Sequence, residues 1–465
     1  MTATVRPSCL LFFSLILLIN GCAAPASRMP ARPGPVLEAQ SRLLQHARVA
    51  HAQGQYETAI GLLRRLLETY PQSSLLPEAR WWLAQSYEKQ GDLKEALAQY
   101  RLIAHATKEG RYTADAQRRT ADLEQLLGIP SPAASGLTAL FARVDQLPPV
   151  PDWESWMKTM SQGGVTTLVF EVTAAGGGVA PGVYFRSELA KVHRDVLGPL
   201  LPIAHRNGIS VFAALTLRRM GWIESGLGWN DWSFDVDRRE LRSSGYLDLF
   251  HPAFQEYLVG LCTDLAATGV DGVLFRGDAP LGPSDGLSSF ALRAFERDFG
   301  VKLDPPKVFP VVKPGERMEY ASEFWRWMGW RARETVKVLD RLKRAMRSHS
   351  PRLRVAVELH PESVTRPLEA LVQYGEDLLE AKRSRFDYYV ISGERPAVNM
   401  QQSDLPGIAE QMLGLLGEPE RIWMTASLPD ASLAQVVNRV AAGSDRLALP
   451  KKIGLVYTRN SAGVP

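Results

Sequence analysis

The segment Gly269-Val-Asp-Gly-Val-Leu-Phe-Arg-Gly-Asp-Ala279 carries the pattern that decides the fold of the larger part of this chain. A turn signal made of glycine and aspartate leads into a short apolar run at 273–275, which stops at Arg276-Gly277-Asp278. An apolar run without alternation is typical of a strand that is buried on both faces. Helical patterns flank the run at 254–267 and 288–299, so the local unit is helix–strand–helix.

The same alternation extends over residues 152–465 and predicts an α/β fold of the (β/α) TIM-like barrel type. An eighth strand is expected to be irregular, around 233–237, or to be absent. A doubly wound open sheet is the alternative. No G-x-G-x-x-G motif follows the first strand, so dinucleotide binding lacks support and no cofactor is expected. The seven clear strands are expected at 165–172, 209–215, 270–276, 353–359, 386–392, 421–426 and 453–457.

The preceding part of the chain, residues 36–128, reads as paired helices. Two segments match each other, Gly54-Gln-Tyr-Glu-Thr-Ala-Ile60 and Gly91-Asp-Leu-Lys-Glu-Ala-Leu97, and they start 37 residues apart (91 − 54). This spacing and the Gly and Ala positions resemble the tetratricopeptide repeat, whose period is about 34 residues. We therefore expect a small all-α repeat domain with a degenerate third pair at 114–127. Such arrays usually bind a protein partner, and a structural spacer is the alternative. Residues 129–151, rich in Pro, Ser and Ala, are expected to form a linker.

The N-terminus has the features of a targeting segment. Arg6 precedes an apolar run at 10–19, and Ile19-Asn-Gly-Cys22 resembles the lipobox of bacterial lipoproteins. Residues 1–21 are then a signal peptide, Cys22 is the lipidated first residue of the mature chain, and 22–35 is a tether. Because Ala23 rather than Asp follows Cys22, the outer membrane is the expected location. An ordinary secretory peptide or a membrane anchor is the alternative, although the apolar run is short for a span.

Composition narrows the possible partners. The chain has 54 basic and 50 acidic residues among 465, and no basic stripe stands out, so nucleic acid is not an expected partner. Outside the N-terminal segment the chain has one cysteine, Cys262, on an apolar helical pattern. We expect this thiol to be buried and inert.

Candidate catalytic residues stand where the predicted strands end, since a parallel barrel carries its chemistry at that face. Glu171 closes the first predicted strand, Asp278 follows the third, and Glu358 closes the fourth with His360 behind it. Converging carboxylates are what glycoside hydrolysis needs, one as the acid and one to activate water or stabilise an oxocarbenium ion. For each carboxylate taken singly, a capping or salt-bridge role fits equally well. Three tryptophans that follow the second strand offer flat faces for sugar rings: Trp222, Trp229 and Trp232.

Residues 153–457 resemble the C-terminal glycoside-hydrolase-like domain of the PgaB family of poly-β-1,6-N-acetylglucosamine deacetylases. The segment Val270-Asp-Gly-Val-Leu-Phe275 carries the most specific match, and weaker ones are Val165–Phe170, Val183-Tyr184-Phe185, Gly208–Ala213, Phe324-Trp325 and Phe386-Asp-Tyr-Tyr389. The resemblance implies a polysaccharide of poly-N-acetylglucosamine type, handled during export or biofilm formation. The substrate-binding set expected on these grounds is Arg276, Trp222, Trp229, Trp232, Tyr184, His360 and Asp285.

Two departures from the family pattern leave two classes of function open. Where the family has His-Asp-Asp-Ala, this chain has Arg276-Gly277-Asp278-Ala279, so only the second acid carries over. The family's metal-dependent deacetylase domain is replaced by the helical repeats, so neither a metal nor deacetylation is expected. Asp278 and Glu358 favour a glycan-cleaving enzyme. Gly277 favours a non-catalytic lipoprotein that holds polysaccharide in the barrel and a partner on its repeats.

Overall fold

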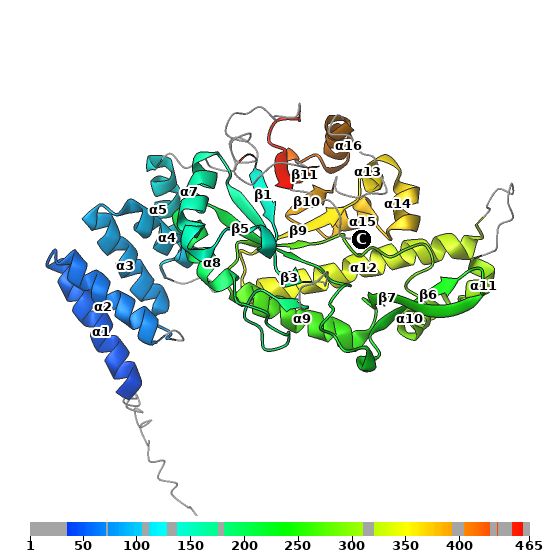
Figure 1. The fold of residues 1–465 in the computed structure, drawn as a ribbon, viewed down its shortest axis with the longest axis horizontal. Coiled ribbons are helices and arrows are strands. Elements are labelled where there is room, and N and C mark those ends of the chain that lie inside the picture. The colour runs from blue at the N-terminus through cyan, green and yellow to red at the C-terminus, as the bar shows by residue number, and fades with distance from the viewer. Residues whose placement is uncertain are drawn as a thin grey trace, which may run out of the picture.

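The computed structural model describes residues 35–70, 73–104, 111–127, 137–174, 181–309, 320–392, 404–427, 435 and 449–458. A helical domain leads into a closed barrel of eight parallel strands, and a further lobe extends from the side of the barrel away from the helical domain (Figure 1). Within the described residues no helix has the length and apolar character needed to cross a membrane. The signal peptide and tether expected at 1–35, including Cys22, lie outside the described residues apart from Pro35.

The N-terminal domain consists of two antiparallel helix pairs and a fifth helix, as the repeat pattern predicts. Gly54 and Gly91 lie in the turns with φ of 76° and 90°, a backbone region that glycine adopts without strain. Ala59 and Ala96 are fully buried, which lets neighbouring helices approach closely. The expected third pair is represented in the described residues by one helix. The five helices are α1 (Pro35–Ala52), α2 (Tyr56–Thr69), α3 (Leu76–Gln90), α4 (Leu93–Ala104) and α5 (Thr113–Leu126).

The barrel closes because its first strand pairs with its last, which excludes the open-sheet alternative. Alternate side chains point inward, and Val169, Phe212, Leu274 and Trp423 fill the interior. Each such side chain stabilises the fold by roughly 1.5–3 kcal/mol through burial. The barrel strands, in their order around the sheet, are β1 (Thr138–Ala142), β2 (Thr167–Glu171), β5 (Ser210–Leu215), β8 (Gly272–Phe275), β9 (Arg354–Leu359), β10 (Tyr388–Ile391), β11 (Ile422–Ser427) and β12 (Gly454–Thr458).

The structure corrects two expectations about these strands. The eighth strand is β1, which lies within the predicted linker 129–151 and pairs with both β2 and β12, so the barrel begins at about residue 138 rather than 152. Residues 233–237 belong instead to an antiparallel hairpin outside the barrel, formed by β6 (Asn230–Asp235) and β7 (Glu240–Leu247). The physical reason is burial. Most of β7 is exposed to solvent, whereas the barrel strands are covered on both faces.

The hairpin belongs to a lobe with its own apolar core. That core contains Phe234 of β6, Phe295 of α10 (Ser289–Phe299), and Trp327 and Trp330 of α12 (Ser322–His349). Figure 1 shows β6, β7, α10 and α11 (Pro305–Val308) gathered at one end of the long helix α12. The other half of α12 packs along α9 (Pro252–Ala267) beside the barrel. Cys262 in α9 is fully buried, as expected, and burial raises the pKa of its thiol to about 12.

The remaining helices and strands cover the barrel or connect its parts. Before β5 come α7 (Trp153–Gln162), the short pair β3 (Thr173–Ala174) and β4 (Gly182–Val183), and α8 (Leu197–Arg206). After β9 come α13 (Glu362–Thr365), α14 (Pro367–Gln373), α15 (Leu378–Arg383) and, before β11, α16 (Leu405–Leu416).

The helical repeats dock against the barrel end where the strands begin. Arg101 of α4 donates through Nη1 to the carbonyl of His205 at 2.8 Å, and Glu95 of α4 lies 3.3 Å from Nε of Arg206. Arg352, just before β9, donates to the carbonyl of Ala104. The strands' carboxyl ends, where a barrel carries its chemistry, are at the opposite end.

Candidate active site

Strand alternation places four polar side chains in one layer at the carboxyl end of the barrel. Val169, Ala214, Leu274 and Ala356 face the interior. The residues two positions later in the chain, at or just beyond the strand ends, face the same way because side chains repeat every second residue. These residues are Glu171, Thr216, Arg276 and Glu358.

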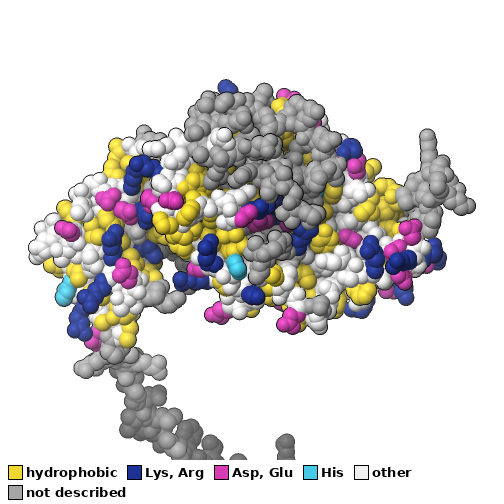
Figure 2. Space-filling view, viewed as in Figure 1, with side chains coloured by type: hydrophobic (Ala, Val, Ile, Leu, Met, Phe, Trp, Pro, Cys, Tyr) yellow, Lys and Arg dark blue, Asp and Glu magenta, His cyan; other side chains and the backbone are white. Residues whose placement is uncertain are grey.

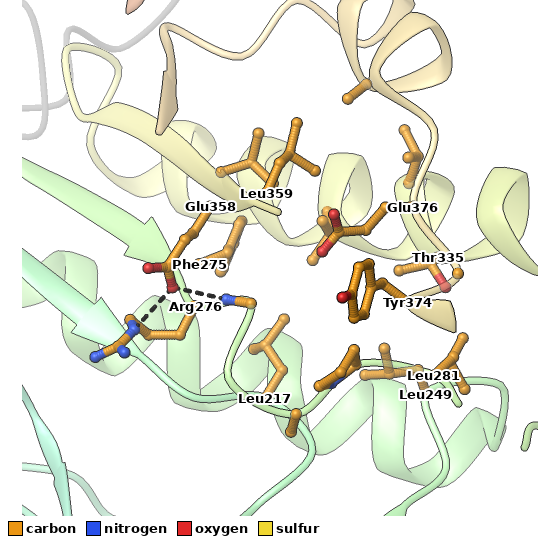
Figure 3. A pocket seen from close by; sticks show the side chains of 18 of the residues that line it. Leu217, Leu249, Phe275, Arg276, Leu281, Thr335, Glu358, Leu359, Tyr374 and Glu376 are labelled. Atoms are coloured by element: carbon orange, nitrogen blue, oxygen red, sulfur yellow. Dashed lines mark hydrogen bonds and ion pairs between the residues drawn. The ribbon is translucent and has the colours of Figure 1, made fainter. Parts of the chain in front are cut away.

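Arg276 joins the two glutamates of this layer. Its Nε donates to Oε2 of Glu358 at 2.9 Å, and its Nη1 lies 3.4 Å from Oε1 of Glu171. Oε2 of Glu358 also accepts from the backbone N–H of Gly277 at 2.9 Å (Figure 3). The guanidinium lies 4.7 Å from the ring centre of Phe141. The expected contact residue Arg276 is therefore the link between two of the expected catalytic residues.

Glu171 has the environment of a proton donor. Burial raises the pKa of its carboxyl above the ordinary value of 4.5, Arg276 lowers it in part, and the charge of Asp278 raises it further. A larger share of Glu171 therefore carries a proton at a given pH than of an exposed glutamate. Asp278 is thus one of the charged groups that raise the pKa of Glu171.

Asp278 makes contacts that differ from those of a turn cap. Its Oδ2 accepts a hydrogen bond from Oγ1 of Thr216 at 2.9 Å. Its Oδ1 is buried and has no hydrogen-bond partner among the described residues. A buried carboxylate oxygen without a partner costs free energy, and a catalytic role is one explanation for such a group in a folded protein.

His360 lies in the wall behind the strand ends, with only 3% of its surface exposed. Its Nδ1 is 2.7 Å from Oε1 of Glu376, its backbone N–H donates to Oε2 at 2.8 Å, and its ring stacks on Tyr374 at 3.7 Å. Its side chain holds Glu376 rather than lining the opening. The sequence does not predict Glu376 as a site residue. Its neighbour Asp377 caps α15, so Glu376 and Asp377 together have the pattern of a helix start.

A small cavity of about 80 Å³ lies beside these residues, between the ends of β8 and β9 and helix α12 (Figure 3). Glu376, Tyr374 and Thr335 line it together with apolar side chains such as Leu217 and Leu281. The carboxylate of Glu358 points away from it, towards Arg276 (Figure 3). Ligand pockets usually measure about 300–1,000 Å³, so this cavity is too small to hold a sugar polymer.

The aromatic residues expected to bind sugar lie in different settings. Trp222 donates through Nε1 to the hydroxyl of Tyr257 at 2.8 Å, and Trp229 packs 5.6 Å from Phe254, so both contribute to packing. Tyr184 is buried next to Phe170. Trp232, on the hairpin, is 42% exposed and offers an open face.

The expected contact residue Asp285 lies in the loop after β8. Its Oδ2 accepts from the backbone N–H of Gly282 at 2.9 Å and lies 4.0 Å from Arg218. These contacts give it a structural role in the loop. Among the described residues, no group of three or more His, Cys, Asp or Glu side chains is placed to hold a metal ion.

Comparison with known proteins supports both parts of the fold. A family model for the tetratricopeptide repeat matches residues 44–111. The glycoside hydrolase domain of PgaB (BpsB) from Bordetella bronchiseptica is similar in structure, with a TM-score of 0.53, 17% sequence identity, and coverage of 69% of this chain and 93% of that one. A β-galactosidase from Bacillus circulans sp. alkalophilus has a TM-score of 0.50 at 11% identity, covering 72% of this chain and 52% of that one. No curated protein matches the sequence. The chain thus carries tetratricopeptide-like repeats followed by a TIM-like barrel similar in fold to these enzymes.

Proposed function

We propose that this chain binds an amino-sugar exopolysaccharide of the poly-N-acetylglucosamine type and hydrolyses it during export or biofilm formation. The observation that carries this proposal is that Arg276 joins Glu171 and Glu358 at the carboxyl end of a closed barrel, where the charge of Asp278 also acts on Glu171. The motif resemblance around Val270–Ala279 supports the choice of polymer.

The roles follow from the surroundings of each carboxyl. Glu171, whose pKa is raised, gives its proton to the glycosidic oxygen as the bond between that oxygen and the anomeric carbon breaks. Asp278 has an oxygen without a partner among the described residues, and it takes a proton from the water that attacks the anomeric carbon. Glu358 holds Arg276 against Glu171, and so fixes the direction in which the acid points.

The test of this proposal is incubation with purified polysaccharide. Asp278→Asn keeps the shape of the side chain and removes its charge, so we expect cleavage to be abolished while retention on the immobilised polymer stays close to wild type. Asp304→Asn, at the half-buried start of α11, is the control and should cleave normally. Cleavage by Asp278→Asn at the wild-type rate would contradict the assigned role.

A non-catalytic scaffold is the second candidate, and the contacts of Arg276 favour it. Both glutamates of the site already have a cationic partner, and Gly277 supplies no acid of its own. If the chain only binds polymer, wild type and Asp278→Asn should both leave the polymer intact while retaining it. A protein that neither retains nor shortens any amino-sugar polymer would contradict both candidates.

We propose an outer-membrane lipoprotein that faces the periplasm, anchored through Cys22, which lies outside the described residues. Cys22→Ala should leave an uncleaved or soluble precursor, and mass spectrometry that finds an unmodified N-terminus elsewhere would contradict the lipid anchor.

A protein partner is proposed for the repeats, where a groove of about 720 Å³ lies between α1 and α3 and is lined by Arg48 and Trp82 among others.

A further inference from the structure

Arg218, three residues after β5, connects three segments that are distant in the sequence. Only 2% of the residue is exposed. Its Nη1 donates to the carbonyls of Ala279, at 3.1 Å, and Pro280, and its Nε donates to the carbonyl of Leu247 at 3.3 Å. Its Nη2 lies 2.6 Å from Oδ2 of Asp231. One guanidinium therefore holds the backbone directly after Asp278, the end of β7, and a side chain of β6.

Asp231 continues this connection to the exposed tryptophan of the hairpin. Its Oδ1 accepts from the backbone N–H of Trp232 at 2.8 Å and from that of Gly286 at 3.1 Å. Its Oδ2 accepts from Oγ of Ser244 at 3.3 Å in addition to Arg218. The carboxylate thus ties the backbone of Trp232 directly to the far end of the loop that follows Asp278, and through Arg218 to the near end of that loop.

A second buried arginine fixes the middle of the same loop. Arg331 of α12 donates through Nη1 to the carbonyls of Gly282 and Asp285, each at 2.7 Å. Burying a charge pair such as Arg218 and Asp231 carries a desolvation penalty, and apolar residues often fill such a space at no loss of stability. Because Arg218 and Arg331 both donate to carbonyls of the loop after Asp278, we assign them the role of fixing the conformation of that loop.

We infer that Arg218 is a positioning residue that holds the segment of Asp278 and the backbone of Trp232 as one rigid unit. The functional half of this inference rests on the proposed function, in which Asp278 acts on the polymer and Trp232 stacks on it. In that case the four hydrogen-bond contacts of Arg218, called the clamp below, set the distance between the sugar that is cleaved and the sugar that is bound by the hairpin.

The first measurement is amide hydrogen exchange, which needs no substrate. Arg218→Met removes all four donated contacts, and Arg218→Lys keeps the charge without the planar fork. Exchange should rise at residues 279–287 and at Trp232 in Arg218→Met, with a smaller rise in Arg218→Lys. Arg421→Met is the matched control, since Arg421 also bonds two backbone carbonyls, of Phe386 and Asp387, and a carboxylate, of Glu418, but at the opposite end of the barrel. Equal exchange in these segments for wild type and both Arg218 variants would overturn the clamp.

The second measurement is made on the polymer. A misplacement of about 1 Å at a reacting group costs about 10²-fold in rate, so kcat of Arg218→Met should fall by about that factor, with partial recovery in Arg218→Lys. Retention on the polymer is then compared in double variants. In Arg218→Met combined with Trp232→Ala, retention should fall by less than the product of the two single effects. In Arg421→Met combined with Trp232→Ala, the fall should equal that product. If the effects of Arg218→Met and Trp232→Ala on retention are also independent, the positioning role is overturned. It is likewise overturned if exchange changes in Arg218→Met while kcat and retention stay at the wild-type values. If wild type neither cleaves nor retains the polymer, the proposed function fails, and exchange alone decides the clamp.

Discussion

Arg276 occupies the place where a barrel usually meets its substrate, and two of its donors are already bound to Glu171 and Glu358. The sequence predicts that both glutamates lie at or near strand ends, as they do, because strand ends and side-chain alternation are local properties that a short segment reveals. It did not reveal the ion pairs, since these depend on which long side chain reaches across neighbouring strands. Nor did it reveal that His360 turns away from the opening to bind Glu376.

At the scale of single residues, the pH dependence of cleavage tests Glu171. Because the acid must be protonated to act, the rate of cleavage should fall as pH rises through the pKa of Glu171. This falling limb of the pH–rate profile should lie above pH 4.5, since burial raises that pKa. Glu171→Gln should lower kcat by about 10²–10⁴-fold. Rates measured from pH 4 to 9 for wild type, Glu171→Gln and the exposed control Glu418→Gln would check this. A variant that retains the same limb would show that another group donates the proton.

Gly272 in β8 tests the packing inside the barrel. A Cβ placed there would lie 2.2 Å from Cε1 of Phe212, whose ring is held by Trp423 at 5.1 Å. Gly272→Ala should therefore lower the free energy of unfolding by about 1–3 kcal/mol, since the ring has little room to move. Gly329→Ala within α12, where a Cβ meets nothing within 4 Å, should raise it by about 0.5–1 kcal/mol. Denaturant titration of both variants measures the difference, and equal midpoints would contradict the packing described.

At the scale of elements, the hairpin β6–β7 was the part that the sequence described least well. Seven strands are clear in the sequence and a (β/α) barrel needs eight, so the pattern leaves the eighth either irregular, around 233–237, or absent. The missing strand, β1, is only five residues long and follows a Pro- and Ser-rich stretch, so its apolar run was hidden by the linker signal. The burial of β6 against the loop after β8, which fixes the hairpin outside the barrel, depends on contacts between residues far apart in the sequence. One is the backbone hydrogen bond from the N–H of Phe234 to the carbonyl of Ser284, 50 residues later (284 − 234).

The three tryptophans on and before the hairpin should respond differently to truncation. Trp232→Ala should weaken retention on immobilised polymer and leave stability nearly unchanged, because its side chain is exposed. Trp222→Ala and Trp229→Ala should instead lower the free energy of unfolding, by up to about 3–5 kcal/mol, because both side chains pack against the core. Retention and denaturant midpoints measured on all three, with the half-exposed Trp325→Ala as control, separate the two effects. Loss of retention in Trp222→Ala at unchanged stability would assign the sugar contact to that residue instead.

At the scale of the whole molecule, the repeats and the candidate site occupy opposite ends of the barrel. Arg101, Arg206 and Arg352 fasten the repeats where the strands begin, and Arg276 lies where they end. A partner on the repeats and a polymer at the site would therefore be held apart by the length of the barrel. The sequence indicated both domains but not this arrangement, because the contacts join residues more than 100 positions apart.

Two fragments test where the barrel begins. A fragment that starts at residue 137 keeps β1 and should be soluble and unfold cooperatively. A fragment that starts at residue 151 leaves β2 and β12 without their shared neighbour, so it should aggregate through the open edges. Size-exclusion chromatography and thermal unfolding distinguish them. A monomeric, cooperatively unfolding fragment from residue 151 would show that β1 is dispensable.

The pairing of β1 with β12 also means that the barrel cannot close until its last strand has been synthesised. The two strands begin 316 residues apart (454 − 138), and ribosomes add about 5–20 residues per second. Roughly 15–60 s therefore pass between the synthesis of the first strand and that of its last neighbour. During this interval the nascent chain is at best an open sheet with an apolar strand at its edge, available for pairing with any other unfinished chain.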